Sequence, residues 1–346
     1  YAEPLASFSW LLGGDYEKGI LREAWKKLLK NHAHDSICGC SIDQVHTENE
    51  IRFDESKQIA EEIKKESLSY WQDVWRRFKK NRLALLGLIL LIVVVSTILI
   101  GPLISGKDYQ QMNNADSNLR PNSEYWFGTD SMGRDIFTRV CVGGRISILI
   151  GLACTGVMFF IGSFFGTLAG LKGGWVDDLI MRFVEFIGNV PYLVIVVVLS
   201  VVLGRSMGAL IFAMSLTSWV GTTRMVRGQV LKLKEEDYIE AAGALGSSTK
   251  RIILKHLLPN TMGIIMVSIT MSVPGFIFGE AFLSYIGLGI RPPKTSWGAL
   301  ASAAQENLMF FPYQLFFPIA MLVITILSFH LIGDGLSDAM DPKLRD

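Results

Sequence analysis

The sequence predicts an all-α, polytopic membrane protein with about six transmembrane helices and an appended soluble helical segment at its N-terminal end. Half of the 346 residues are apolar, and the mean hydropathy of +0.35 is high for a soluble protein of this length. The apolar residues gather in long uncharged blocks, and a helix of about 20 apolar residues spans a bilayer core about 30 Å thick. The net charge is only +1 and the basic residues lie beside apolar blocks, so we expect membrane lipid and no nucleic acid as a partner.

The chain changes character near residue 66, which divides it into segments 1–66 and 67–346. Residues 1–66 are charged, and their apolar side chains recur at helical spacing over 20–29 and again after an interruption at 38–40. The first ten residues lack the basic and apolar regions of a signal peptide. We therefore expect the first apolar span, far downstream, to direct insertion.

Residues 67–82 predict an amphipathic helix that lies in the membrane interface. One helical face is cationic and the other is apolar, with the apolar face made of Trp71, Val74, Trp75 and Phe78. The alternative is a plain cytoplasmic extension of the first membrane span.

Residues 83–106 contain no charged side chain and predict the first transmembrane helix. Further spans are predicted at 146–171, 180–203, 207–223, 263–289 and 312–333. Lys and Arg gather before the first span, between the fourth and the fifth, and in the C-terminal tail. Since cytoplasmic loops carry the excess of Lys and Arg, we expect both termini to be cytoplasmic.

The most specific motif lies between the fourth and fifth predicted spans and consists of Glu240-Ala241-Ala242, Gly246, His256 and Leu258-Pro259. The spacing predicts a helix–turn–helix, because the alanines let a partner surface approach and Gly246 permits a turn with positive φ. Pro259 is expected to stop the following helix. The alternative is an ordinary cytoplasmic loop with amphipathic helices.

A second motif lies in the first outer loop and consists of Gly128-Thr129-Asp130 and Gly133-Arg134-Asp135. Two glycine-centred turns, with an arginine between carboxylates, suit a compact loop that pairs with itself. We expect Asp130, Arg134 and Asp135 individually to fold the loop, and the loop as a whole to shape the outer mouth.

The fifth predicted span carries a carboxylate, Glu280. A carboxylate at the centre of a span costs roughly 2.5–3.5 kcal/mol on insertion scales, whereas each Phe or Ile returns only about 0.3–0.6 kcal/mol. Glu280 is therefore expected to face protein or water rather than lipid. A structural partner and a contact with substrate are both open.

These motifs make residues 67–346 similar to permease subunits of ATP-binding-cassette importers, in the oligopeptide/dipeptide (peptide/nickel) branch. The segment from Glu240 to Pro259 resembles the EAA signature of such permeases, and His256 is a variant associated with the peptide branch. The outer-loop motif resembles the FGTD–GRD signature of the same branch, and residues 333–342 resemble the usual end of these chains.

The resemblance implies a multi-pass permease subunit of the bacterial cytoplasmic membrane that translocates peptides. It also implies a homologous second permease subunit, an extracytoplasmic substrate-binding protein touching the outer loop, and two ATPase subunits that receive the Glu240–Pro259 segment. The sequence holds no GxxxxGK[ST] P-loop, so we expect no enzyme and no cofactor in this chain, with ATP and Mg on the partner subunits. Peptides, nickel chelates and sugars share this branch, so the substrate stays open.

Residues 1–66 resemble a fragment of glycoside hydrolase family 38, the α-mannosidases, through the runs 22–29 and 31–41. Carried over, His34 is a vestigial match to a zinc ligand, and Asp35 is a neighbour of the sugar. A catalytic zinc site needs about three protein ligands, so we expect this segment to be non-functional and the chain to hold no metal. The alternatives are a membrane-tethered α-mannosidase and an interaction module with a local zinc site made of His32, His34, Cys38 and Cys40.

Overall fold

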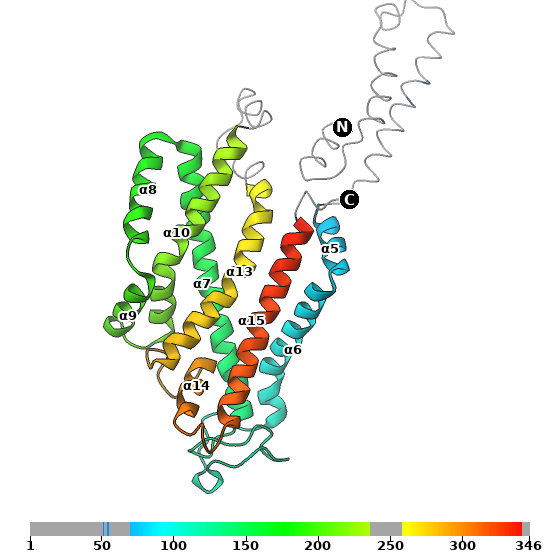
Figure 1. Cartoon of the computed structure of the whole chain (residues 1–346), viewed down its shortest axis with the longest axis vertical. Coiled ribbons are helices and arrows are strands. Elements are labelled where there is room, and N and C mark those ends of the chain that lie inside the picture. Colours follow the sequence, from blue (N-terminus) through cyan, green and yellow to red (C-terminus); the bar gives the residue numbers. More distant parts are fainter. Residues whose placement is uncertain (1–50, 52–53, 55–69, 236–257, 341–346) are drawn as a thin grey trace, which may run out of the picture. The chain divides into compact units, whose positions relative to one another are not determined.

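The computed structural model describes residues 51, 54, 70–235 and 258–340. The chain divides into two compact units, one with residues 1–81 and 336–346 and the other with residues 82–335. Within the described residues there is no β-strand, and an isolated bridge joins Thr129 to Asp135. The predicted all-α class is therefore confirmed (Figure 1).

The described elements follow one another as helices joined by short or moderately long loops. Their bounds, in chain order, are α5 Tyr70–Lys80, α6 Arg82–Ser105, the 3₁₀ turn η1 Asn114–Asp116, α7 Ile136–Lys172, α8 Gly174–Gly188, α9 Tyr192–Val202, α10 Met207–Lys234, α13 Leu258–Tyr285, α14 Trp297–Gln305 and α15 Tyr313–Met340. The predicted junction near residue 66 and the predicted helices of 1–66 lie outside the described residues, apart from residues 51 and 54, which are helical.

Four helices of the described chain are long and apolar enough to cross a membrane, namely α6, α7, residues 265–285 of α13, and α15. They coincide with the first, second, fifth and sixth predicted spans. The polytopic class is thus confirmed, and the count rises to five if the bent pair α8–α9 is one span. The sequence predicted about six spans, and the difference concerns the third and the fourth.

The third predicted span, 180–203, is two short helices rather than one straight helix. The axes of α8 and α9 differ by 77°. Pro191 lies at the break and is the N-cap residue of α9. Because proline lacks an amide proton and disfavours the helical conformation of the preceding residue, here Val190, the helix ends before it.

The fourth predicted span, 207–223, lies within α10, which is 28 residues long but is not among the helices apolar enough to count as candidate spans. Its buried residues include several hydroxyl side chains: Ser215, Thr222 and Thr223. Small hydroxyl residues are typical of membrane helices that pack against other helices. These hydroxyl residues, together with the Arg and Lys residues in the second half of α10, lower the hydropathy of the helix.

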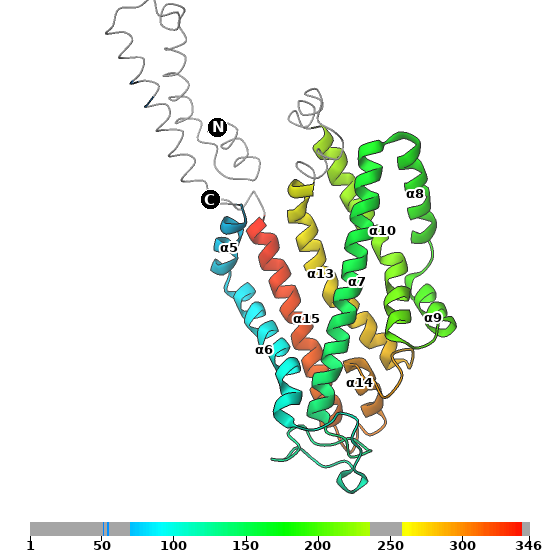
Figure 2. The ribbon, with the colours of Figure 1, turned by 180° about the vertical axis from the view of Figure 1, so that it is seen from behind.

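Helices α7 and α10 lie side by side and make the most extensive contact between any two described helices (Figures 1 and 2). Three glycines of α7, spaced four residues apart, allow this approach. A Cβ atom added at Gly162 would lie 2.6 Å from Thr222 Cβ. A Cβ atom added at Gly166 would lie 2.7 Å from the Thr223 carbonyl oxygen, and one added at Gly170 would lie 2.8 Å from Val230 Cγ1. Such stripes of small residues let membrane helices approach at backbone distance.

An arginine of α7 compensates for a proline in α6. Pro102 cannot donate to the carbonyl of Ile98, four residues earlier, so that oxygen lacks its helical partner. Arg145 Nε donates to the Ile98 oxygen at 2.7 Å, and Arg145 Nη2 donates to the Leu99 oxygen at 2.8 Å. Backbone groups inside a bilayer need protein partners, so this contact makes Pro102 tolerable in a membrane helix.

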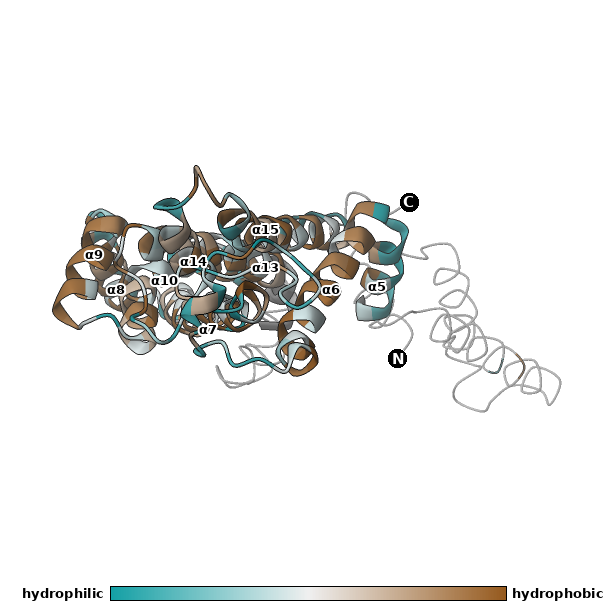
Figure 3. Cartoon of the chain, turned by 90° about the horizontal axis from the view of Figure 1, so that it is seen from below, coloured by the Kyte–Doolittle hydropathy of each residue, from teal (hydrophilic) through white to brown (hydrophobic). Residues whose placement is uncertain are grey.

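Large apolar side chains are exposed on the outward faces of the helices of the second unit. Figure 3 shows apolar residues along α6, α8 and α9. The most exposed of these side chains include Leu103, Phe160, Phe186 and Val202. Exposed apolar surface on this scale fits contact with lipid or with other subunits.

Helix α5, in the first unit, confirms the helix predicted within 67–82. Val74 and Phe78 are buried, whereas Trp71 and Trp75 are about half exposed. Trp75 stacks on Phe78 with ring centroids 5.6 Å apart, and the Lys79 ammonium lies 5.2 Å from the Trp75 ring. The location of this helix in the membrane interface stays a prediction.

The glycine stripe gives a matched test of packing. Gly166→Ala should lower the free energy of unfolding by about 1–3 kcal/mol, because the new methyl group meets the backbone of α10. Gly156→Ala, in the same helix with nothing within 4 Å of the added Cβ, should leave stability unchanged or raise it by up to about 1 kcal/mol. Thermal or denaturant unfolding in detergent measures both, and equal effects would refute the close approach.

Candidate functional site

The outer-loop motif folds around Asp130. Its Oδ1 accepts hydrogen bonds from the amides of Met132 and Arg134 at 2.9 and 3.1 Å, and its Oδ2 accepts one from Arg134 Nε at 2.7 Å. Arg139 Nη1 lies 3.6 Å from the same Oδ2. One carboxylate therefore closes the Asp130–Arg134 turn and pairs with two guanidinium groups.

Both motif glycines of the loop have positive φ, +77° at Gly128 and +69° at Gly133. Gly133 also passes so close to the Asn113 carbonyl that a Cβ atom could not be placed there. Positive φ and close approach together explain why glycine occupies this position. The turns predicted at these glycines are present in the structure.

Thr129 and Asp135 connect the turn to its surroundings. Thr129 is fully buried, and its hydroxyl oxygen accepts from the Leu119 amide at 2.8 Å and donates to the Asp116 carbonyl. Asp135 is the N-cap of α7, and its Oδ2 accepts from the Thr138 amide at 2.9 Å. Thr129 therefore holds the loop together and Asp135 fixes the start of α7, which is what the structural interpretation of the motif predicts.

The loop is also attached to the start of α15. Gln314 Nε2 donates to Asn118 Oδ1 at 2.9 Å and to the Thr129 carbonyl at 3.0 Å. The rings of Phe127 and Phe317 stack with centroids 3.8 Å apart. Elements distant in sequence thus hold the loop against the end of the bundle.

Tyr125 and Asp116 form a further contact inside the loop. The Tyr125 hydroxyl donates to Asp116 Oδ2 at 2.8 Å. This hydrogen bond, together with burial and the negative charge of Asp116, raises the pKa of Tyr125 to about 12. The phenol therefore keeps its proton, and the contact, throughout the neutral pH range.

Glu280 is fully buried in α13 and lies at the centre of a polar cluster. Its Oε2 accepts from Ser147 of α7 at 2.8 Å, and its Oε1 accepts from Ser284, one turn along α13, at 2.6 Å. The Ser296 hydroxyl caps α14 and also donates to Ser284 Oγ at 3.3 Å. The Trp297 amide donates to Ser147 Oγ at 3.3 Å. The cluster therefore ties α7, α13 and α14 together.

Trp297 completes this junction. It is fully buried, and its indole Nε1 donates to the Val140 carbonyl at 2.9 Å. Since both oxygens of Glu280 are hydrogen-bonded to other helical residues, the geometry fits a structural partner, one of the two open interpretations. Contact between substrate and Glu280 would require the cluster to separate.

Most of the predicted coupling residues lie outside the described residues: Glu240, Ala241, Ala242, Gly246 and His256. Leu258 and Pro259 open α13. A proline in the first turn of a helix costs little, because its missing amide proton would have no helical acceptor there. Pro259 therefore lies in the first turn of α13, and its predicted role of ending the preceding helix concerns residues outside the described ones.

Sequence reasoning missed an ion pair between α8 and α10. Arg227 Nε donates to Asp177 Oδ1 at 2.6 Å, and Arg227 Nη2 donates to Oδ2 at 2.5 Å. Such bidentate pairs are strong and directional. Both residues lie just outside the predicted spans, where a charge needs no buried partner, and they are 50 residues apart in sequence, so no pattern indicated the pair. It fixes α10 shortly before the segment that holds Glu240.

Among the described residues, no group of three or more His, Cys, Asp or Glu side chains is placed to hold a metal ion. The proposed local zinc site of His32, His34, Cys38 and Cys40 lies outside them. That hypothesis therefore stays a prediction.

Comparison with known proteins follows the same division of the chain. Residues 162–346 match the family described as binding-protein-dependent transport system inner membrane component, and residues 69–121 match the N-terminal TM domain of oligopeptide transport permease C. Residues 1–70 match the alpha mannosidase middle domain, which confirms the resemblance seen in the sequence.

Several curated proteins are similar over most of the chain. The oligopeptide transport system permease protein OppC of Bacillus subtilis (strain 168) is 45% identical over 286 residues, covering 83% of this chain and 94% of that protein. The dipeptide transport system permease protein DppC of the same strain is 44% identical over 303 residues, covering 87% of this chain and 95% of that protein. A solved structure of the MetNI methionine ABC transporter in an inward-facing conformation matches with a TM-score of 0.48 and 18% identity, covering 59% of this chain and 96% of that one.

The buried carboxylate gives a test of the α7–α13–α14 junction. Glu280→Leu should lower the free energy of unfolding by about 1–3 kcal/mol, because the hydroxyls of Ser147 and Ser284 lose a buried acceptor. Glu280→Gln keeps an acceptor oxygen and should cost less. Glu306→Leu, the same change at an exposed residue, serves as control. Unfolding in detergent measures all three, and an E280L variant as stable as E306L would contradict the junction.

Proposed function

Because the chain belongs to the family of binding-protein-dependent transport system inner membrane components, we propose that it is a permease subunit of an ATP-driven importer that translocates peptides across the bacterial cytoplasmic membrane. The observation that carries the proposal is the identity of 44–45% to permeases named for oligopeptide and dipeptide transport, over nearly their whole length. The candidate membrane spans support it. The family is one of transporter subunits, so the expectation of a permease rather than an enzyme is confirmed.

The partners proposed are a homologous second permease, two ATP-binding-cassette ATPases and an extracytoplasmic substrate-binding protein. ATP and Mg belong to the ATPase subunits. The exposed apolar faces of α8 and α9 support a further membrane partner, since both carry large apolar side chains such as Phe186 and Val202 at the surface. The compact outer loop, with its motif residues Gly128 to Asp135, is the surface proposed for the substrate-binding protein.

The segment Glu240–Pro259 is proposed to couple this subunit to an ATPase. It connects α10 to α13. Helix α10 is joined to α8 by the Asp177–Arg227 pair and to α7 by the glycine stripe. A displacement of the segment would therefore move α7, α8 and α10 together, rather than α10 alone.

The distribution of Lys and Arg supports a cytoplasmic location for both termini and for this segment. The N-terminal region 1–66 is proposed to be a mannosidase-like fragment without catalytic function, and 67–346 the permease domain. This division is supported by the separate family matches to residues 1–70 and 162–346.

Substitutions in the segment test the coupling. Gly246→Val or Glu240→Lys should abolish ATP-dependent uptake while the chain still inserts, because the ATPase contact is lost. Gly228→Val, in α10 with open space beside its Cβ position, is the matched glycine control and should keep uptake. Uptake in vesicles and copurification of the ATPases are the measurements. If both segment variants still support uptake and still copurify with the ATPases, the coupling role proposed for Glu240–Pro259 is wrong.

A deletion and an assay test the N-terminal fragment. Removing residues 1–66 while keeping 67–82 should leave transport largely intact, because the family match begins at residue 69. The full chain should hydrolyse no α-mannoside, since His34 alone cannot make a catalytic zinc site. Turnover that disappears in His34→Ala would make the protein bifunctional and overturn this part of the proposal.

A further inference from the structure

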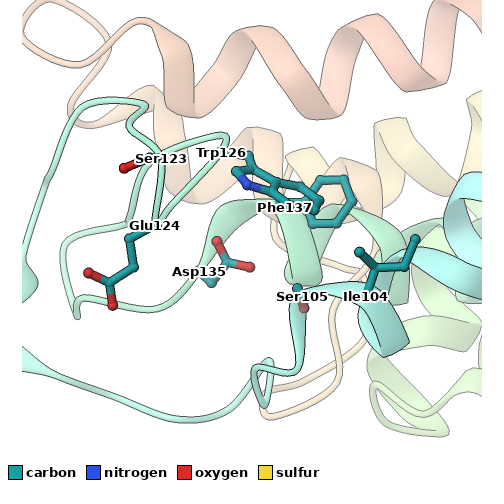
Figure 4. A pocket seen from close by; sticks show the side chains of 7 residues that line it. All are labelled: Ile104, Ser105, Ser123, Glu124, Trp126, Asp135 and Phe137. Carbon is teal, nitrogen blue, oxygen red and sulfur yellow. The ribbon is translucent and has the colours of Figure 1, made fainter.

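A pocket of about 180 Å³ lies at the C-terminal end of α6. Its walls come from the last residues of α6, from the following loop and from the start of α7 (Figure 4). Asp135, Glu124 and Trp126 are among the lining residues, and the Ser105 hydroxyl lies beside them. The loop proposed above as a docking surface forms part of its wall, but none of the functions proposed above requires a ligand in this pocket.

Asp135 gives the pocket its charge. The residue is 5% exposed, and its Oδ2 accepts hydrogen bonds from the amide and the hydroxyl of Thr138. Asp130 in the same loop pairs with two arginines, whereas Asp135 forms no ion pair with any described residue. The Thr138 donors and the N-terminal end of α7 stabilise this carboxylate, and a cation in the pocket would add the ion pair that it lacks.

Glu124, the other carboxylate of the lining, already has a cation beside it. Lys107 Nζ lies 3.8 Å from Glu124 Oε1 and donates to the Glu124 carbonyl oxygen at 2.7 Å. The same ammonium lies 3.2 Å from the centre of the Tyr125 ring. Asp135 is therefore the carboxylate of the pocket that has no ion-pair partner among the described residues.

The other walls select the kind of cation. Trp126 and Phe137 meet edge to face with ring centroids 4.8 Å apart, and both line the pocket. Aromatic faces attract organic ammonium groups, whereas divalent metal ions require several oxygen ligands at short distance. A primary ammonium can donate to Asp135 and lie against an aromatic ring at the same time.

The position of the pocket indicates where this ammonium comes from. Helix α6 is a candidate membrane span, and the pocket lies where it ends. Ile104, which lines the pocket, is 65% exposed, and its neighbour Leu103 is 80% exposed. Trp126 is about half exposed, and tryptophan is enriched at the level of the lipid headgroups. A lipid whose chains lie along α6 has its headgroup at this level.

We propose that the pocket binds the primary ammonium of an aminophospholipid, of the phosphatidylethanolamine class, in the leaflet at the C-terminal end of α6. Asp135 accepts the ammonium, and Trp126 and Phe137 shield it from water. Because Asp135 also caps α7, the bound lipid stabilises the junction between the outer loop and the bundle.

Asp135→Asn tests the proposal. Asparagine caps helices about as well as aspartate, so the variant removes the charge and keeps the acceptor for the Thr138 amide. Native mass spectrometry of the purified full chain, titrated with phosphatidylethanolamine, should show about tenfold weaker binding in the variant, as expected for losing one charge-assisted hydrogen bond. Affinity for phosphatidylglycerol, which has no ammonium, should not change. Asp108→Asn, at an exposed carboxylate of the same loop outside the lining, should behave as wild type.

Several outcomes would overturn the proposal. Unchanged affinity for phosphatidylethanolamine in D135N is one, and equal weakening for both lipids is another. A third is that D135N keeps its affinity for the lipid but binds the substrate-binding protein more weakly in membranes without phosphatidylethanolamine. That result would mean that the pocket binds a lysine of the substrate-binding protein instead. If D135N does not fold, Trp126→Leu should weaken phosphatidylethanolamine binding about threefold, because it removes the aromatic face. Unchanged phosphatidylethanolamine affinity in Trp126→Leu would also refute the proposal.

Discussion

Helix α7 approaches α10 along Gly162, Gly166 and Gly170 so closely that a methyl group at any of these positions would meet the neighbouring helix. Apolar surface gives membrane helices little reason to associate, so close packing and hydrogen bonds must hold them together. The same two helices also take part in polar contacts with α13 and α8, one buried and one partly buried. Ser147 of α7 binds Glu280 of α13, and Arg227 of α10 binds Asp177 of α8. The placement of α8, α10 and α13 therefore depends on one helix pair.

At the end of the bundle that carries the Gly128–Asp135 motif, polar groups likewise need partners inside the protein. Pro102 frees a carbonyl in α6, and Arg145 of α7 donates to it. Asp130 holds the loop turn, while Asp135 caps α7 and faces the pocket beside α6. The motif residues that resemble a family signature thus fold the loop in this structure, and one of them, Asp135, caps α7. Their proposed contact with an external protein would build on that rigidity.

The sequence was most informative where a helix faces lipid and least informative where it faces protein. Helix α6 is uniformly apolar, so its span was predicted nearly to its ends. Helix α10 contains hydroxyl residues such as Thr222, which is buried against α7. Polar residues of this kind lower the hydropathy of α10 below the value expected of a membrane span. Pro191 could have indicated the break between α8 and α9, but a proline does not define the bend angle.

The candidate sites show the same limit. The cost of a carboxylate in a span predicted a polar environment for Glu280, yet only the fold shows that three serines and the Trp297 backbone surround it. The Asp177–Arg227 pair was missed because sequence cannot say which cation lies beside which carboxylate. The residues Glu240 to His256 were identified from their spacing alone, and they lie outside the described residues.

Substrate uptake by a reconstituted complex tests the central claim, that this chain is the permease subunit of a peptide importer. Proteoliposomes would contain this chain with its partner permease, the two ATPases and the substrate-binding protein, and labelled di- and oligopeptides would be offered beside a nickel chelate and a sugar. The account predicts ATP-dependent accumulation of peptide that is lost when this chain is omitted. Accumulation of the chelate or the sugar without peptide, or peptide uptake that does not require this chain, would contradict it.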